Sequence, residues 1–443
     1  MLAAPPALRG SPVSWFMPLL TKCATAFAIV AVSAACAPRD DAGTVHFWAL
    51  GHEGEAVAQL IPAFERAHPE IRVRVQQIPW SAAHEKLLTA FVGDSLPDVL
   101  QLGTTWIPEF HALGAIERLD AYIARSATVA PDDHFPGVWD ANAIDGARVA
   151  IPWYVDTRLL FYRSDLLARA GVATAPTTWS DWRDAMQSVQ QGIGEDRHAI
   201  FVPLSEWEVP VALAFSKDAE LLRDGDTFGN FQSDAFRAAF AFYLDLFARG
   251  FAARAGAGAS ASVYRDFADG WFCFYLSGPW NLGEFATRLP AALANDWSTA
   301  PLPGVDAEHP GVSLAGGASL AIAASSPRKD AAWQLIEWLA QPAQEIAFYR
   351  ASGDLPPRRS AWRDPVLADD ARAQAFRTQL EHVRAVPKVP EWERIAAKIS
   401  RTAESAVRGE VSADAALARL DAEVDAILAK RRSLLLRAQP AAD

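Results

Sequence analysis

The chain has 443 residues, of which 51% are apolar and 21% charged, so it is long enough for two lobes with sizeable cores. Its formal net charge of −12 argues against a nucleic-acid-binding protein, which needs a clustered basic surface. Three cysteines are too few for a disulfide framework, so the fold must depend on its apolar core.

Residues 1–36 are expected to be an export leader, with Met17 as an alternative start. The apolar run 23–32 is too short for a transmembrane span, and small residues follow it up to Cys36. Cys36 resembles the acylated cysteine of a bacterial lipoprotein, with Ser33 in place of the usual leucine. Since cleavage at an Ala-x-Ala site there is equally open, we expect a periplasmic or cell-surface protein, either free or tethered through 37–43.

The segment that follows alternates between strand and helix patterns. Strands are predicted over 45–50, 71–75 and 98–102, and helices over 56–67 and 82–91. This β-α-β-α-β order predicts an α/β lobe with a largely parallel sheet. Ligands of such sheets bind beyond the carboxyl ends of the strands, which is where the loops 51–55 and 103–106 lie.

Further along, Asp145-Gly146 is a hairpin signal, and strands are predicted over 149–157 and 159–162. Trp333 and Trp338 stand at helical spacing, which is typical of a core. Other indoles occur in polar, turn-like settings: Trp80, Trp106, Trp153, Trp207, Trp271 and Trp280. Helical patterns fill 180–190, 234–249, 328–340, 368–384 and 391–432.

The most informative stretch is 273–285, where an apolar strand ends in Gly278-Pro279 and Trp280 follows at once. A turn that presents an aromatic ring beside amide and carboxylate groups suits a sugar, which has an apolar C–H face and hydroxyls that need fixed partners. The alternative reading is a core tryptophan after a turn.

Several stretches, in this order and spacing, resemble the extracellular solute-binding proteins of bacterial carbohydrate ABC importers, and among them the proteins that bind maltose and trehalose. The resemblance covers roughly 44–430. It is carried by the segments 64–71, 93–99, 151–166, 277–285 and 316–322.

The resemblance implies an α/β fold of two lobes, each a mostly parallel sheet flanked by helices, with the ligand cleft between them. One lobe would comprise 44–156 and 306–345, and the other 157–305 and 346–435. It also implies hinge closure around an oligosaccharide of the maltose or trehalose class, delivery to the membrane permease subunits, and a monomer without cofactor or metal.

Site residues are implied one by one. Glu53 and Asp156 would accept hydrogen bonds from sugar hydroxyls. Tyr154, Trp207 and Trp280 would supply rings. The remaining candidates are the pair Gly316 and Gly317, which would let backbone approach the sugar, and Arg358, with Arg359 as its alternative, which would donate to sugar oxygens.

Two positions depart from the most similar relatives, because Gly103 and Ala318 replace an Asp and a Trp. Thr104, Thr105 and Trp106 are candidates to substitute for the lost contacts. A secreted glycosidase is the rival in another class, since Glu53 and Asp156 could serve as its two carboxylates. A binding protein for a peptide, polyamine or iron is the other alternative, and the many indoles favour sugar.

Overall fold

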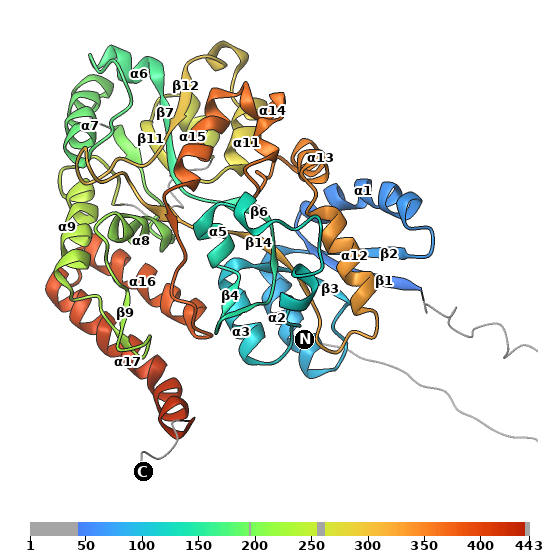
Figure 1. The fold of residues 1–443 in the computed structure, drawn as a ribbon. Helices are drawn as coiled ribbons and strands as arrows, with labels where there is room; N and C mark the ends of the chain where they lie inside the picture. The colour runs from blue at the N-terminus through green and yellow to red at the C-terminus, as the bar shows by residue number, and fades with distance from the viewer. Residues whose placement is uncertain (1–42, 195, 255–261, 439–443) are drawn as a thin grey trace, which may run out of the picture. The chain divides into compact units, whose positions relative to one another are not determined.

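The computed structural model describes residues 43–194, 196–254 and 262–438 (Figure 1). The expected leader, Cys36 and residues 37–42 of the expected tether lie outside these residues. Across the three described ranges, no helix has the length and apolar character that a bilayer crossing requires.

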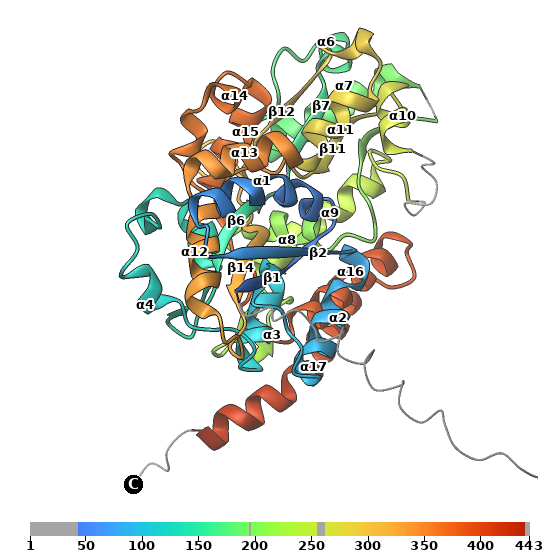
Figure 2. The ribbon, with the colours of Figure 1, turned by 90° about the vertical axis from the view of Figure 1, so that its right-hand side faces the viewer.

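Two β-sheets with helices packed on both faces form the body (Figures 1 and 2). The first has the order β2-β1-β3-β14-β6 and the second β12-β7-β11-β8. The strands of the first are β1 (Thr44–Leu50), β2 (Arg72–Ile78), β3 (Val99–Gly103), β6 (Ile151–Asp156) and β14 (Gly316–Ile322). Those of the second are β7 (Leu159–Arg163), β8 (His198–Phe201), β11 (Phe272–Ser277) and β12 (Trp297–Ala300).

Apart from its exposed edge strand β2, the first sheet is buried on both sides, and its strands alternate their side chains between two cores. Leu320 and Ile322 of β14 pack with α1 (Glu53–Ala67) and α12 (Lys329–Leu339) on one face. Ala321 of the same strand points to the other face, which Leu87 of α2 (Trp80–Val92) helps to cover. Trp333 and Trp338 of α12 are buried in the first of these cores, as predicted.

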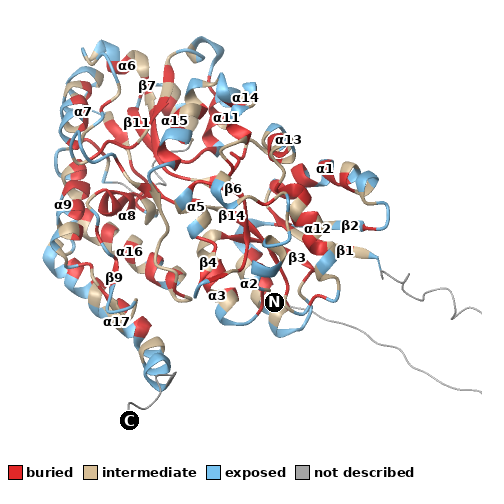
Figure 3. Ribbon diagram, in the orientation of Figure 1, coloured by how far each residue is buried: buried red, intermediate tan, exposed pale blue. Residues whose placement is uncertain are grey.

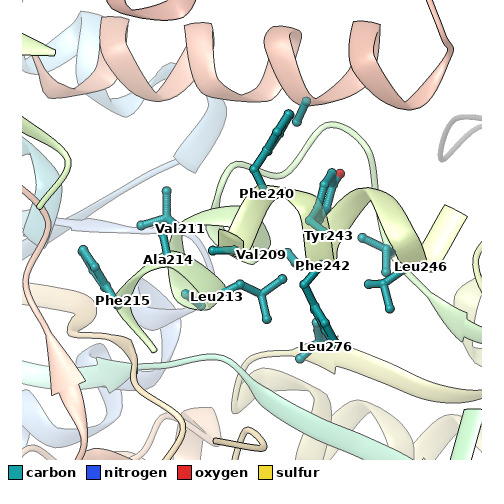
Figure 4. Packing of buried hydrophobic residues seen from close by; sticks show 14 of the residues in the cluster. Val209, Val211, Leu213, Ala214, Phe215, Phe240, Phe242, Tyr243, Leu246 and Leu276 are labelled. Carbon is teal, nitrogen blue, oxygen red and sulfur yellow. The ribbon is translucent and has the colours of Figure 1, made fainter. Parts of the chain in front are cut away.

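The second sheet is covered in the same way. On one face, α8 (Glu208–Phe215) and α9 (Asp234–Ala248) pack together through Val211, Leu213, Phe240 and Tyr243 (Figure 4). On the other face lie α11 (Trp280–Arg288) and α15 (Ala371–Leu380). Buried residues follow the strands and the inner sides of the helices, and exposed residues face outward (Figure 3).

Strand direction has one exception in each sheet. In the first sheet β1, β2, β3 and β6 run the same way and β14 opposes them. In the second, β8, β11 and β12 run the same way and β7 opposes them. The reason is that β7 and β14 are the strands by which the chain enters a sheet from the other one.

The segments that join the two sheets are bonded to one another. Gly316, at the start of β14, pairs with Asp156, at the end of β6. On the other edge of β6, the backbone N–H of Val155 donates to Leu355 O at 2.9 Å. The lobe boundaries set out above stay predictions.

Two long helical patterns are interrupted. The pattern over 391–432 comprises two helices, α16 (Trp392–Val407) and α17 (Ala413–Ala438), because the Ser412 side chain accepts a hydrogen bond from the Ala415 N–H and starts a new helix. The pattern over 368–384 holds only α15, because residues 383 and 384 form β15 (Val383–Arg384), which pairs with β13 (Ser313–Leu314). The hairpin at Asp145-Gly146 is confirmed, between β4 (Ala143–Ile144) and β5 (Ala147–Arg148).

The remaining elements cover the sheets and the loops between them. They are α3 (Ile107–Ala112), α4 (Asp120–Ile123), α5 (Pro136–Asp140), α6 (Ser164–Arg169), α7 (Trp179–Ile193), α10 (Val263–Ala268), α13 (Pro342–Ser352), α14 (Pro365–Ala368), β9 (Leu222–Arg223) and β10 (Phe228–Gly229).

Replacement of Gly317 by alanine is expected to destabilise the fold by about 2–5 kcal/mol. Its φ of +122° disfavours any side chain, and a Cβ atom there would lie 2.2 Å from Tyr154 O. Urea denaturation would measure the loss. As a control, Gly192→Ala in α7, where a Cβ meets open space, should be neutral or stabilising by up to about 1 kcal/mol. Equal stability of Gly317→Ala and wild type would contradict the close approach of β14 to β6.

Candidate functional site

A cavity of about 1280 Å³ lies where the strands of the two sheets end. From the first sheet it receives the residues that follow β1, β2, β3 and β6, and from the second those that follow β8 and β11. The cavity therefore lies beyond the carboxyl ends of strands, which is where ligands of α/β sheets bind. Its lining includes Glu53, Thr104, Thr105, Trp106, Tyr154, Asp156, Trp207, Trp280, Gly316 and Gly317.

Indole rings form part of the wall on both sides. Trp80 and Trp106 meet edge to face with centroids 5.5 Å apart on the first side. Trp280 stands on the second side at the start of α11. Trp80 and Trp280 are each 37% exposed, which is high for so large an apolar side chain. The rings are thus open to a ligand and not core residues.

A buried carboxylate lies beside these rings. Glu53 is only 3% exposed, at the first turn of α1, and its Oε1 accepts hydrogen bonds from the Tyr154 hydroxyl at 2.7 Å and from Trp80 Nε1 at 3.1 Å. Gln101 Nε2 donates to the same hydroxyl at 3.2 Å. Burial, together with the nearby carboxylates, raises the pKa of Tyr154 well above its usual value, so the tyrosine is a stable donor.

A second carboxylate on this wall holds a proton near neutral pH. Burial, and next the charge of Glu53, raises the pKa of Asp354 to about 7. His52 lies between the two, with Nδ1 3.4 Å from Glu53 Oε2 and Nε2 3.7 Å from Asp354 Oδ2. The wall therefore offers acceptors, and below neutral pH also a carboxyl donor, to a ligand.

The opposite part of the cavity holds an ion cluster centred on Arg158. Its Nη1 lies 2.8 Å from Asp156 Oδ1, its Nη2 3.0 Å from Glu208 Oε1 and its Nε 3.8 Å from Glu206 Oε2. Burial opposes the charge of Arg158, but the three carboxylates outweigh it and raise its pKa above the usual value. Burial also raises the pKa of Glu206 to about 7 in spite of Arg158.

Some predicted residues have contacts that differ from those expected. Gly316 and Gly317 line the cavity, but a Cβ on either would press on backbone oxygens of β6, so close strand packing requires them. The Thr104 hydroxyl donates to Gly317 O at 2.9 Å. Trp207 lines the cavity while its ring packs edge to face on Trp392.

Arg358 has contacts that differ from those expected. It does not line the cavity, because its Nε donates to Asp133 Oδ2 at 2.8 Å and its Nη1 donates to Thr128 O and Ala340 O at 3.0 and 2.8 Å. Arg358 is 7% exposed and holds these segments together. Its alternative, Arg359, pairs with Glu381 instead and also lies outside the lining.

Sequence reasoning missed several lining residues. Among them are His52, Trp80, Arg158, Glu208 and Asp354. Two had a usable signal, because Trp80 is one of the indoles in a polar, turn-like setting and Arg158 stands two residues after Asp156. Of the six indoles in polar settings, Trp153 is buried and stacks on Phe348, and Trp271 is exposed outside the cavity. The other four line the cavity.

Comparison with known proteins identifies the family of the chain. Residues 48–346 match the family model described as bacterial extracellular solute-binding protein. The chain belongs to this family. The diacetylchitobiose-binding protein DasA of Streptomyces coelicolor is 26% identical over 366 residues, which are 81% of this chain and 83% of that protein.

Solved structures of this solute-binding family have the same fold. The sugar-binding protein MalE of Xanthomonas citri is 50% identical, with a TM-score of 0.87 over 90% of this chain and 100% of that one. The GacH receptor of Streptomyces glaucescens, at 23% identity, matches with a TM-score of 0.76 over 87% of this chain and 98% of that one, which concerns the fold alone. The expected two-lobed α/β fold is thereby confirmed.

The stability of the wild type relative to Asp354→Asn is expected to fall as pH rises from about 4 to about 7. The folded pKa of Asp354 is raised to about 7, so in this window the folded state binds more protons than the unfolded state, and raising the pH disfavours it. Urea denaturation measures the free energy of unfolding of both proteins at pH 5 and at pH 8. The difference between them should change by at least about 1 kcal/mol from one pH to the other.

The matched control for this pH effect is Asp94→Asn. Asp94 is exposed and has a φ of +48°, which asparagine tolerates. The difference in the free energy of unfolding between Asp94→Asn and the wild type should therefore not change between the two pH values. A constant difference for Asp354→Asn as well would mean that this carboxyl is ionised in the folded protein throughout the window.

Proposed function

We propose that the protein is the sugar-binding receptor of an ABC importer and captures an α-linked glucose disaccharide, maltose or trehalose. The observation that carries the proposal is the pairing, in one cavity of about 1280 Å³, of exposed indoles with buried and half-buried carboxylates. Trp80 and Trp280 contribute the rings, and Glu53, Asp156 and Asp354 contribute the acids.

The chemistry of a sugar fits both kinds of wall. The C–H face of a pyranose packs on an indole, and its hydroxyls donate to carboxylates in charge-assisted bonds. Glu53 accepts from Tyr154 and Trp80, and these neutral donors hold it in place without cancelling its charge. A cavity of this size also exceeds what a single amino acid needs and suits a ligand of two or more rings.

The similar proteins support a sugar as the ligand. MalE of Xanthomonas citri is described as sugar-binding and DasA as binding diacetylchitobiose. By analogy, we propose that the lobes close on the ligand by hinge motion and that the closed form, as a monomer, docks on the permease. Tethering through Cys36 remains part of the proposal, and a lipid tail would keep the receptor near its permease.

Isothermal titration calorimetry with maltose and trehalose tests the proposal. We expect heat of binding with at least one of them, and a matching rise in Tm because a ligand that binds only the folded state stabilises it. A response to a pentose or an amino acid, with neither disaccharide active, would contradict the ligand class. Release of glucose during the titration would instead favour the glycosidase alternative.

Replacement of Trp280 by alanine is expected to weaken disaccharide binding by about 2–4 kcal/mol, roughly thirtyfold to a thousandfold in Kd, because a stacked ring is lost. The fold should survive, since the ring is already 37% exposed. Trp271→Ala is the matched control, because Trp271 is 44% exposed and lies outside the cavity. If both variants bind as the wild type does, Trp280 does not stack on the ligand.

A further inference from the structure

Arg158 lies where two of the segments that join the sheets meet. It stands between β6 and β7, in the first crossing of the chain. Its backbone N–H donates to Ser313 Oγ at 3.1 Å, and that hydroxyl donates back to Arg158 O at 2.7 Å. Ser313 lies in the segment by which the chain returns from β12 to β14, so the two crossings are tied together at this residue.

The guanidinium of Arg158 has a fixed orientation. Asp156 comes from the end of β6. Glu208 is the first residue of α8, and Glu206 lies in the loop between β8 and α8. Arg158 is 7% exposed. A buried guanidinium among three carboxylates cannot turn away, because the acids would then be left without a partner.

The indole of Trp280 packs against this guanidinium. The Cζ atom of Arg158 lies over the ring, 4.7 Å from its centroid, which is a cation–π contact. Gly278 limits the ring from another direction, since a Cβ atom there would lie 1.9 Å from Trp280 Cζ3. The ring is nevertheless 37% exposed, so part of it remains open to the cavity.

We propose that Arg158 is a positioning residue for the ligand, which holds the Trp280 indole in the orientation that stacks on a sugar ring. This inference rests on the function proposed above. In this role Arg158 acts through the indole, because its guanidinium is only 7% exposed and is held by Asp156 and Glu208 through Nη1 and Nη2. The aromatic platform is thus fixed to the crossing, the part of the chain that belongs to both lobes.

Arg158→Lys tests this role without leaving the three acids unpaired. Lysine keeps the charge, but its compact ammonium cannot cover a ring as the planar guanidinium does. We expect the Kd for whichever disaccharide the wild type binds to rise about tenfold. In a Trp280→Ala background the same substitution should change the Kd by less than about twofold, since the indole through which Arg158 acts is gone.

A second measurement does not need a ligand. The fluorescence of Trp280 is obtained as the difference between each protein and its Trp280→Phe partner. In Arg158→Lys, acrylamide should quench this difference signal more strongly than in the wild type, because the ring has lost its backing and moves more freely.

The matched control is Arg163→Lys. Arg163 is also buried, pairs with Asp165 at 2.7 Å and lies 6.0 Å from the Phe267 ring, but it is outside the cavity. The Arg163→Lys substitution should lower Tm and leave both the Kd and the quenching of Trp280 unchanged.

Three results would overturn the positioning role. The first is unchanged quenching and affinity in Arg158→Lys. The second is an equal loss of affinity with and without the indole, which would mean that Arg158 acts independently of Trp280. The third is a change in the Kd and in the quenching of Trp280 in Arg163→Lys that equals the change in Arg158→Lys. If no disaccharide binds even the wild type, the proposed function fails, and the quenching measurement still decides whether Arg158 holds the ring.

Discussion

The pairing of β14 with β6 is the contact on which the rest of the site depends. In the first sheet β6 has β14 as its neighbour, and β14 in turn pairs with β3, so β14 links β6 to the strands that come first in the chain. This link places Tyr154 within hydrogen-bond distance of Glu53. Gly317 permits it, because its missing side chain lets the two backbones approach.

The acids in and beside the cavity are accommodated in three physically different ways. Asp156 and Glu208 are paired with a cation, Arg158, which offsets the unfavourable loss of hydration. Glu53 is held by neutral donors. Asp354 and Glu206 retain protons up to near-neutral pH because burial disfavours their charged forms. The wall with Glu53 can therefore present a charge beside a carboxyl group, while the opposite part of the cavity presents acids that Arg158 neutralises.

The parts of the fold that could be predicted from sequence are those whose signals are local. The strands and helices of residues 44–103 have strong periodicity, and Trp280 is marked by the Gly-Pro turn before it. The contacts of Arg358 could not be predicted, because its partner Asp133 is 225 residues away and no local pattern reveals that pairing.

Asp354 shows the same limit. Nothing around it in the sequence indicates that it lies near His52 and Glu53, about 300 positions earlier, and its pKa is raised by burial and next by the charge of Glu53. The helical pattern over 368–384 was overridden for a similar reason, because residues 383 and 384 pair with a strand near residue 313. Amphipathic periodicity therefore identified elements, and the long-range contacts decided their ends and their roles.

The place of β14 in the middle of the first sheet also has a consequence for biosynthesis. Strand β6 ends at Asp156, but its neighbour begins at Gly316, so this sheet cannot be completed until about 160 further residues have been made. At a synthesis rate of about 5–20 residues per second, that interval is on the order of ten seconds or more. Val99 likewise pairs with Ile322, and such distant contacts slow folding because a long loop must close first. The nascent chain thus stays without a complete first sheet throughout this interval, with the edge of β3 that β14 later covers still unpaired.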